Sequence, residues 1–172
     1  MSCSVGGDAD VVLAALLPAM REKHSYKALY VDHFVALFDG HQVDLPEKVS
    51  LERYLAVPQV LVSVRGDATG MIDVPLRELG VTRTVQATLT RFSALPLVLR
   101  ETRLLCNVPE TSARYLAQAY GLQIRQLPVQ SPEFTIGLAW QQALDRDPFT
   151  QWFIKLVESL LTELRPSACT RA

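Results

Sequence analysis

Residues 58–70, which decide the fold, read Pro-Gln-Val-Leu-Val-Ser-Val-Arg-Gly-Asp-Ala-Thr-Gly. The largely apolar run 58–63 is typical of a strand that is covered on both faces of a sheet. A polar loop with two glycines follows, and a helical pattern over 70–79 then stops at Gly80. Strand, loop and helix in this order indicate one βαβ unit of a parallel sheet.

The same alternation continues on both sides of this stretch. Apolar runs predict further strands at 10–14, 26–38, 84–89, 104–108 and 134–140. Helical patterns cover 51–56 after Ser50, 94–101 after Ser93, 109–120 before Gly121, and 148–164 after Asp147. We therefore expect an α/β fold with a mostly parallel sheet.

The helix predicted at 148–164 has the clearest pattern in the chain. Asp147 can cap it, and Pro148 stands at its first position. Its large apolar side chains recur at helical spacing, which predicts one row along the helix: Phe149, Trp152, Phe153, Leu156, Val157, Leu160, Leu161 and Leu164.

Composition excludes several classes of protein. The 172 residues carry 17 basic and 18 acidic side chains without a basic stripe, so the chain alone does not look nucleic-acid binding. No apolar run approaches the roughly 20 residues of a membrane span, and the start lacks a secretion signal. Cys3, Cys106 and Cys169 form no metal or redox spacing, which favours reduced thiols in the cytoplasm.

Common signatures of catalysis and cofactor binding are missing from the sequence. It has no GxGxxG, GxxxxGK[ST], GxSxG or HExxH motif. The histidines, His24, His33 and His41, do not share a zinc-ligand spacing. We expect no catalytic residue, no metal and no cofactor, although a site assembled only in three dimensions would leave no such motif.

The loop after residue 63 is the first candidate binding site. Ligands of open α/β sheets bind at the carboxyl ends of the strands, where helix N-termini offer free N–H groups. Arg65, Gly66 and Thr69 would supply a cation, a close backbone approach and a hydroxyl. Equally well, Asp67 or Thr69 could cap the helix, with Arg65 in solvent; the two interpretations weigh about the same.

Two further residues could line the same cleft. Phe92 follows the strand predicted at 84–89 and could form a wall, although core packing is at least as good an interpretation. His33 lies in a long apolar strand, where a structural role is about twice as common as ligand contact. If His33 faces the cleft, it could hydrogen-bond an anionic aromatic molecule.

Four stretches, at 7–35, 50–62, 73–84 and 105–148, together resemble the effector-binding domain of LysR-type transcription regulators, in the branch of nodulation and aromatic-degradation activators. They include Gly-Asp-Ala-Asp-Val-Val-Leu at 7–13, Leu-Glu-Arg-Tyr-Leu at 51–55, Leu-Gly-Val-Thr-Arg at 79–83, and Asp-Arg-Asp-Pro at 145–148. The likeness covers nearly all of 7–164.

This resemblance implies a periplasmic-binding-protein-like fold of type 2, with two Rossmann-like lobes and the effector between them. Lobe II would be complete at 31–134, and lobe I would be incomplete. The expected lobe I segments are 1–30 and 135–165, the hinge strands 26–38 and 134–142, and the frayed tail 166–172.

The resemblance also implies a function. His33 and Thr69 match effector-contacting positions of aromatic-responsive members, and the same cleft geometry adds Arg65, Gly66, Phe92 and Ala139. The chain would sense a small aromatic or carboxylate effector and pair with itself or with full-length regulator subunits. It would reach DNA only through a helix-turn-helix domain that these residues lack. Alternatives are a truncated regulator acting only as an oligomerisation module, or a small-molecule-binding enzyme.

Overall fold

The protein forms two compact units in a computed structural model that describes residues 9–63 and 68–164 (side chains through 161). One unit, here the inner unit, comprises residues 32–133. The other, the terminal unit, combines the segments before residue 32 and after residue 133. The predicted tail 166–172 lies outside the described residues.

The inner unit is built on one five-stranded sheet. Its order is β5 (Val85–Leu89), β4 (Gln59–Val62), β6 (Leu105–Pro109), β3 (Phe34–Phe38) and β7 (Gln123–Arg125). β4 is parallel to both β5 and β6, whereas β3 is antiparallel to β6 and β7. Only β3 therefore runs against the others, and the predicted mostly parallel sheet is confirmed for the inner unit alone.

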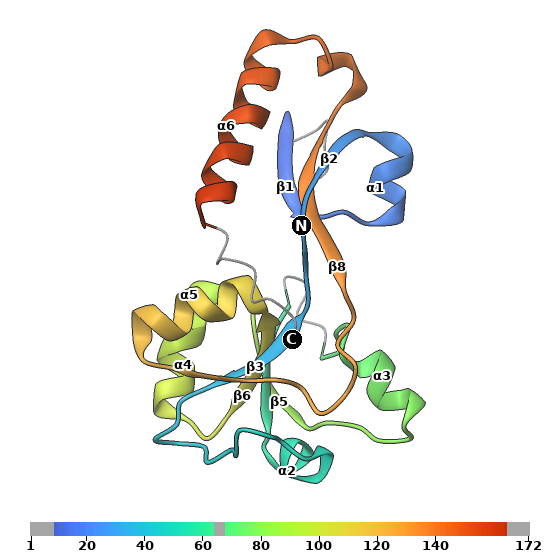
Figure 1. Ribbon diagram of the computed structural model, residues 1–172. Coiled ribbons are helices and arrows are strands. Elements are labelled where there is room, and N and C mark those ends of the chain that lie inside the picture. The colour runs from blue at the N-terminus through green and yellow to red at the C-terminus, as the bar shows by residue number, and fades with distance from the viewer. Residues whose placement is uncertain (1–8, 64–67, 165–172) are drawn as a thin grey trace, which may run out of the picture. The chain divides into compact units, whose positions relative to one another are not determined.

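Side chains of this sheet point alternately to its two faces, and an apolar layer packs on each face. On one face Val60 and Cys106 pack with α4 (Leu95–Glu101) and α5 (Glu110–Tyr120). On the other face Leu105 and Phe38 pack with α2 (Leu51–Ala56) and α3 (Asp73–Glu78). Helices thus cover both faces of the sheet, as Figure 1 shows.

The terminal unit has a smaller sheet in the order β1 (Val11–Ala15), β8 (Phe134–Trp140), β2 (Ser25–Asp32). β1 and β8 are antiparallel, with Leu13 opposite Leu138. Two helices complete it: α1 (Pro18–Lys23), which sequence patterns did not predict, and α6 (Pro148–Leu164). Its core joins Leu138 and Trp140 to Ile154 of α6.

The predicted apolar row of α6 divides into two. Ile154, absent from the predicted row, is buried, and Val157 packs beside it. The other side of the helix exposes a set that we call the α6 row: Phe149, Trp152, Leu156 and Leu160. Within the ranges 9–63 and 68–164, no helix is long and apolar enough to cross a membrane.

Capping signals predicted the ends of several helices correctly. The Ser50 side chain accepts a hydrogen bond from the amide of Arg53 at the start of α2, and Asp147 accepts one from Thr150 at the start of α6. Gly121 ends α5 with a positive φ of 71°. These signals act within one helical turn, so sequence suffices to find them.

Three predicted elements need correction. The strand predicted at 26–38 is broken at His33, whose carbonyl accepts the amide of Glu110 instead of continuing a ladder. Ser93 does not cap α4; it lies inside a 3-10 turn, Phe92–Ala94, and α4 follows directly. The helix predicted at 70–79 begins only at Asp73, because residues 71–72 form a turn before it.

Gly121 supplies a test of the fold. An added Cβ at this position would meet no atom within 4 Å, so only the left-handed backbone opposes a side chain. We expect Gly121→Ala to lower the free energy of unfolding by about 1 kcal/mol in urea titrations. Gly121→Asn should cost less, because asparagine tolerates this conformation. Equal stability of the wild type and the two variants would show that residue 121 does not adopt the left-handed conformation at the end of α5.

Candidate functional site

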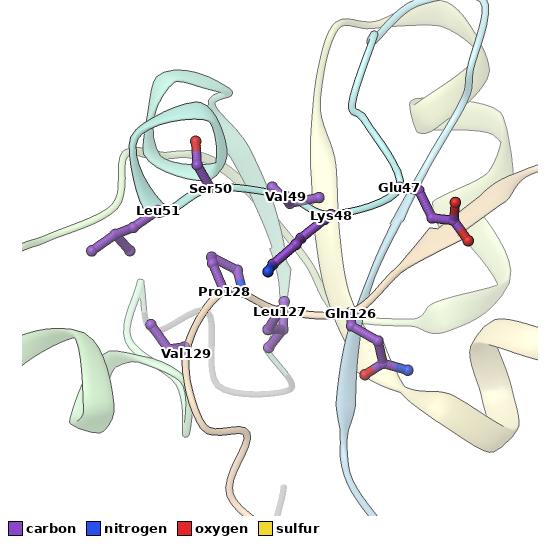
Figure 2. A pocket seen from close by; sticks show the side chains of 9 residues that line it. All are labelled: Glu47, Lys48, Val49, Ser50, Leu51, Gln126, Leu127, Pro128 and Val129. Atoms are coloured by element: carbon purple, nitrogen blue, oxygen red, sulfur yellow. The ribbon is translucent and has the colours of Figure 1, made fainter. Parts of the chain in front are cut away.

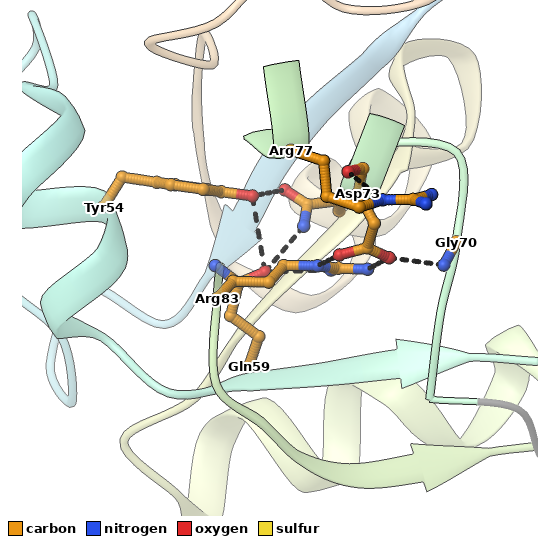
Figure 3. A network of polar contacts seen from close by, with 7 residues as sticks. Tyr54, Gln59, Gly70, Asp73, Arg77 and Arg83 are labelled. Carbon is orange, nitrogen blue, oxygen red and sulfur yellow. Dashed lines mark hydrogen bonds and ion pairs between the residues drawn. The ribbon is translucent and has the colours of Figure 1, made fainter. Parts of the chain in front are cut away.

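A buried ion pair lies beneath the turn that carries Thr69. Arg83, just before β5, places Nε 2.7 Å from Asp73 Oδ1 and Nη2 2.8 Å from Asp73 Oδ2. The Arg83 side chain is only 1% exposed, and that of Asp73 16%. This two-point geometry joins the first residue of α3 to the residues entering β5 (Figure 3).

Three further polar side chains, those of Gln59, Asn107 and Tyr54, support this pair. Arg83 Nη1 donates to Gln59 Oε1 at 3.0 Å, and Asn107 Nδ2 donates to the same oxygen at 2.7 Å. The Tyr54 hydroxyl lies 3.0 Å from Asn107 Oδ1. Because a guanidinium only donates hydrogen bonds, Gln59 must turn its side-chain oxygen toward Arg83. Asn107 must then turn its NH₂ group toward the same oxygen. Gln59 Nε2 is then buried without a partner among the described residues.

The charges of the pair are held in their ionised forms. Burial acts to raise the pKa of Asp73, but hydrogen bonds from Arg83 and from the amide of Gly70 outweigh it, so the pKa lies below its ordinary value. Burial acts to lower the pKa of Arg83, and Asp73 more than compensates, so that pKa is raised. Burial raises the pKa of the Tyr54 hydroxyl, which keeps it neutral as a donor.

The network also shapes the turn before α3. Asp73 Oδ2 accepts the amide of Gly70. A Cβ on Gly70 would lie 3.2 Å from Leu61 Cδ1 and 3.4 Å from Arg83 Nη2, so this position favours glycine for its close packing. Thr69 next to it lines a pocket of about 300 Å³, bounded by Ala68, Asp73, Leu76, Arg77, Val81, Thr82, Arg83 and Val85.

His33 lies at the carboxyl ends of the parallel strands. β3 starts there opposite the end of β6, with Phe34 paired to Pro109. His33 Nε2 is 3.7 Å from Glu110 Oε2, and Glu110 Oε1 is 2.7 Å from Arg114 Nη2. Imidazole, carboxylate and guanidinium therefore form a short row at the first turn of α5. About a third of the His33 side chain is exposed (33%), so a ligand can reach it.

The structure does not bring the other predicted residues into one pocket. Phe92 starts the turn after β5, is 42% exposed, and does not line the pocket of Thr69, and neither does His33. Ala139 is buried in the terminal unit, opposite Val12 of β1. Arg65 and Gly66 lie outside the described residues.

A second, larger pocket of about 610 Å³ was not anticipated. It lies between the segment 47–51, whose last residue begins α2, and the segment 126–129. Figure 2 shows Lys48 extending toward Pro128 and Leu127, while Glu47 points away from them. The sequence gives no signal for it, because neither segment has a periodic pattern.

Metal and thiol chemistry find no support in the described part of the chain. No three His, Cys, Asp or Glu side chains of that part gather as metal ligands would. Burial raises the pKa of the Cys106 thiol to about 12, so this cysteine is a core side chain and not a nucleophile.

Comparison with protein families gives one match across most of the chain. The model described as "LysR substrate binding domain" matches residues 5–162. The chain is 28% identical over 138 residues to Nodulation protein D 2 of Rhizobium leguminosarum bv. phaseoli, covering 78% of this chain and 42% of that protein. It is 27% identical to Nodulation protein D 3 of Mesorhizobium japonicum, covering 88% and 50%. The chain thus spans about half the length of these relatives.

Solved structures agree with this match. The regulatory domain of MexT, a transcriptional activator in Pseudomonas aeruginosa, is 28% identical with a TM-score of 0.74, covering 89% of this chain and 75% of that one. The effector binding domain of QuiR in complex with shikimate gives a TM-score of 0.67 over 90% and 72%. At 12% identity, the QuiR comparison shows the fold alone.

The buried pair predicts a pH-dependent contribution to stability. Removing one partner of such a pair costs about 3–5 kcal/mol, because the other charge stays buried. We expect Asp73→Asn to lose about this much at pH 7 in urea unfolding. The depressed pKa of Asp73 stabilises the fold above the unfolded value near 3.8, and that contribution is lost as the pH falls through the lower folded value. The gap between wild type and variant should therefore narrow in acid.

The exposed Asp44 provides a matched control for this experiment. Asp44→Asn should change stability by less than about 0.5 kcal/mol at any pH. In a double-mutant cycle, Asp73→Asn and Arg83→Met together should cost less than the sum of the two single changes. Simple additivity would mean that the pair is not coupled.

Proposed function

The chain belongs to the LysR substrate-binding domain family, and from this premise we propose that it senses a small aromatic or carboxylate effector for a transcription regulator. The observation that carries the proposal is the family match over 5–162, together with the two-unit α/β fold. Effector binding would favour one arrangement of the two units, through a difference in affinity between the two states.

We place the effector at the edge of the inner sheet where His33 stands. This edge is the carboxyl end of the parallel strands, which is the usual ligand position in open α/β sheets. The imidazole of His33 and the hydroxyl of Thr69 would hydrogen-bond the effector, and the exposed ring of Phe92 would offer an apolar wall. Arg65 and Gly66 complete the proposed set in the inner unit; Ala139, which is fully buried in the terminal unit, is left out of it.

The first turn of α5 limits which groups at this edge can bind an anionic effector. Asp32 already occupies the amides of Glu110 and Thr111, so these N–H groups are not offered to an anion. The charge of Glu110 is offset by Arg114 at 2.7 Å. An effector carboxylate would therefore rely on His33 and on the proposed Arg65, and an aromatic body would extend toward Phe92.

The same proposal includes the kind of ligand, the cellular location and the partners of the chain. The QuiR domain, which shares the fold, holds shikimate, a small molecule. The regulator would work in the cytoplasm as a homo-oligomer or with full-length subunits, and would contact DNA through a helix-turn-helix domain outside these residues. We assign it no catalytic residue and no cofactor, in keeping with a family of regulators.

A second candidate function is that of an interaction module. The α6 row of four large apolar side chains favours it, because exposed apolar surface of this kind promotes association between subunits. In this alternative the chain would modulate a regulator by pairing with it and would need no effector.

Calorimetry with a panel of aromatic carboxylic acids tests the sensor. We expect His33→Ala and Thr69→Ala each to weaken binding about 5- to 100-fold, from the loss of one hydrogen bond. His41→Ala is the matched control, since His41 is exposed and follows the opposite end of β3 from His33, and it should leave the affinity unchanged. Unchanged binding in the His33 and Thr69 variants would remove the assignment of this site.

Sedimentation over a range of concentrations tests the interaction module. We expect wild type to self-associate through the α6 row, and Trp152→Glu to shift the equilibrium at least ten-fold toward the monomer, because burying an unpaired charge is costly. Gln151→Glu introduces the same charge on the neighbouring position and serves as the control. A wild-type monomer at high concentration would argue against this role.

A further inference from the structure

Both chain connections between the units enter the inner unit beside the first turn of α5. The inner unit begins at Asp32 and ends at Glu133. The change in environment at the first connection is abrupt, since Val31 is 62% exposed and Asp32 only 4%. The burial of Asp32 is unusual for a carboxylate, which normally stays in solvent unless it is partnered.

Among the described residues, the partners of Asp32 are backbone amides. Oδ1 accepts the amide of His33 at 2.8 Å and that of Glu110 at 3.0 Å, and Oδ2 lies 3.4 Å from the amide of Thr111. Two of these amides belong to the first turn of α5, where the helix lacks internal partners and carries partial positive charge. The carbonyl of His33 adds a fourth link, because it accepts the amide of Glu110 at 2.9 Å.

The second connection is tied to the first. Ser131 precedes the end of the inner unit by two residues, and its Oγ accepts the amide of Phe34 at 2.6 Å. Phe34 is the first residue of β3, directly after His33. Both connections are thereby attached to the same short segment of the inner unit.

We propose that Asp32 and Ser131 form a clamp that fixes both connections to the inner unit, so that the units pivot at Val31 and at Pro132–Glu133 while His33 keeps its place against α5. Asp32 is then a positioning residue: it holds His33 and Glu110 in register whatever the hinge does. The pivot is confined to the ends of the connecting segments and does not spread along the hinge strands 26–38 and 134–142. The clamp refines the proposed sensor, and its test needs no effector, so the two can fail separately.

Spin-label distances across and within the units test the clamp. Labels at Gln118→Cys on α5 and Lys155→Cys on α6 span the two units, and labels at Glu52→Cys and Gln118→Cys stay within the inner unit; all three positions are exposed. Cys3→Ser and Cys169→Ser form the background, and Cys106 stays because its buried thiol is labelled far more slowly than a cysteine at an exposed position. In the double variant Asp32→Asn, Ser131→Ala, the between-unit distribution should broaden at least two-fold, and the within-unit distribution should stay unchanged.

Amide hydrogen exchange provides the local readout. The amides of His33, Phe34, Glu110 and Thr111 should exchange about ten-fold faster or more in the double variant. Ser131→Ala alone is the mild variant in case the double variant folds poorly, and it should accelerate exchange at Phe34 only, with a smaller broadening.

Asp39→Asn is the matched control, because Asp39 is also buried and accepts a backbone amide, that of His41, away from both connections. It should leave the between-unit distances as in wild type. Faster exchange with unchanged between-unit distances would show that Asp32 only caps α5. Equal broadening in Asp39→Asn would show a general loss of stability; either result overturns the clamp.

Discussion

The burial of one positive charge, that of Arg83, constrains much of the inner unit. A guanidinium removed from water requires acceptors on every side, and here Asp73 and Gln59 provide them. The hydrogen bonds that Arg83 needs determine the orientation of the side-chain amides of Gln59 and Asn107, and they hold Asp73, the first residue of α3, in place. The turn that carries Thr69 is therefore shaped by electrostatics beneath it, and not by its own sequence alone.

A buried negative charge, that of Asp32, similarly fixes the structure at the edge of the same sheet. Asp32 places its carboxylate on the free amides of α5, where the helix would otherwise attract an anion from solution. The protein thus uses this helix end for its own architecture. In the proposed sensor, recognition at this edge would fall to side chains such as His33, whose imidazole remains partly exposed. The proposed effector contacts would therefore not compete with Asp32 for the backbone amides of α5.

Local signals carried most of the predictable part of this fold. The strand at 59–62, the cap at Ser50 and the glycine at 121 depend on a few adjacent residues, and the sequence predicts them correctly. The break at His33 depends on Glu110, 77 positions further along the chain, and no periodicity foretells it. The polar network escaped prediction for the same reason, since Arg83 and Asn107 lie 24 and 48 positions from Gln59. Of the proposed site, sequence could identify His33 and Thr69 as candidates but could not show that Asp32 fills the helix end between strand and helix.

The sulfhydryl of Cys106 has a practical consequence. It lies in the middle of the layer formed with α4 and α5, and its high pKa leaves almost no thiolate at neutral pH. Alkylating reagents can reach it only when that layer opens. The rate at which Cys106 is alkylated therefore reports how often the inner core opens, without any introduced cysteine.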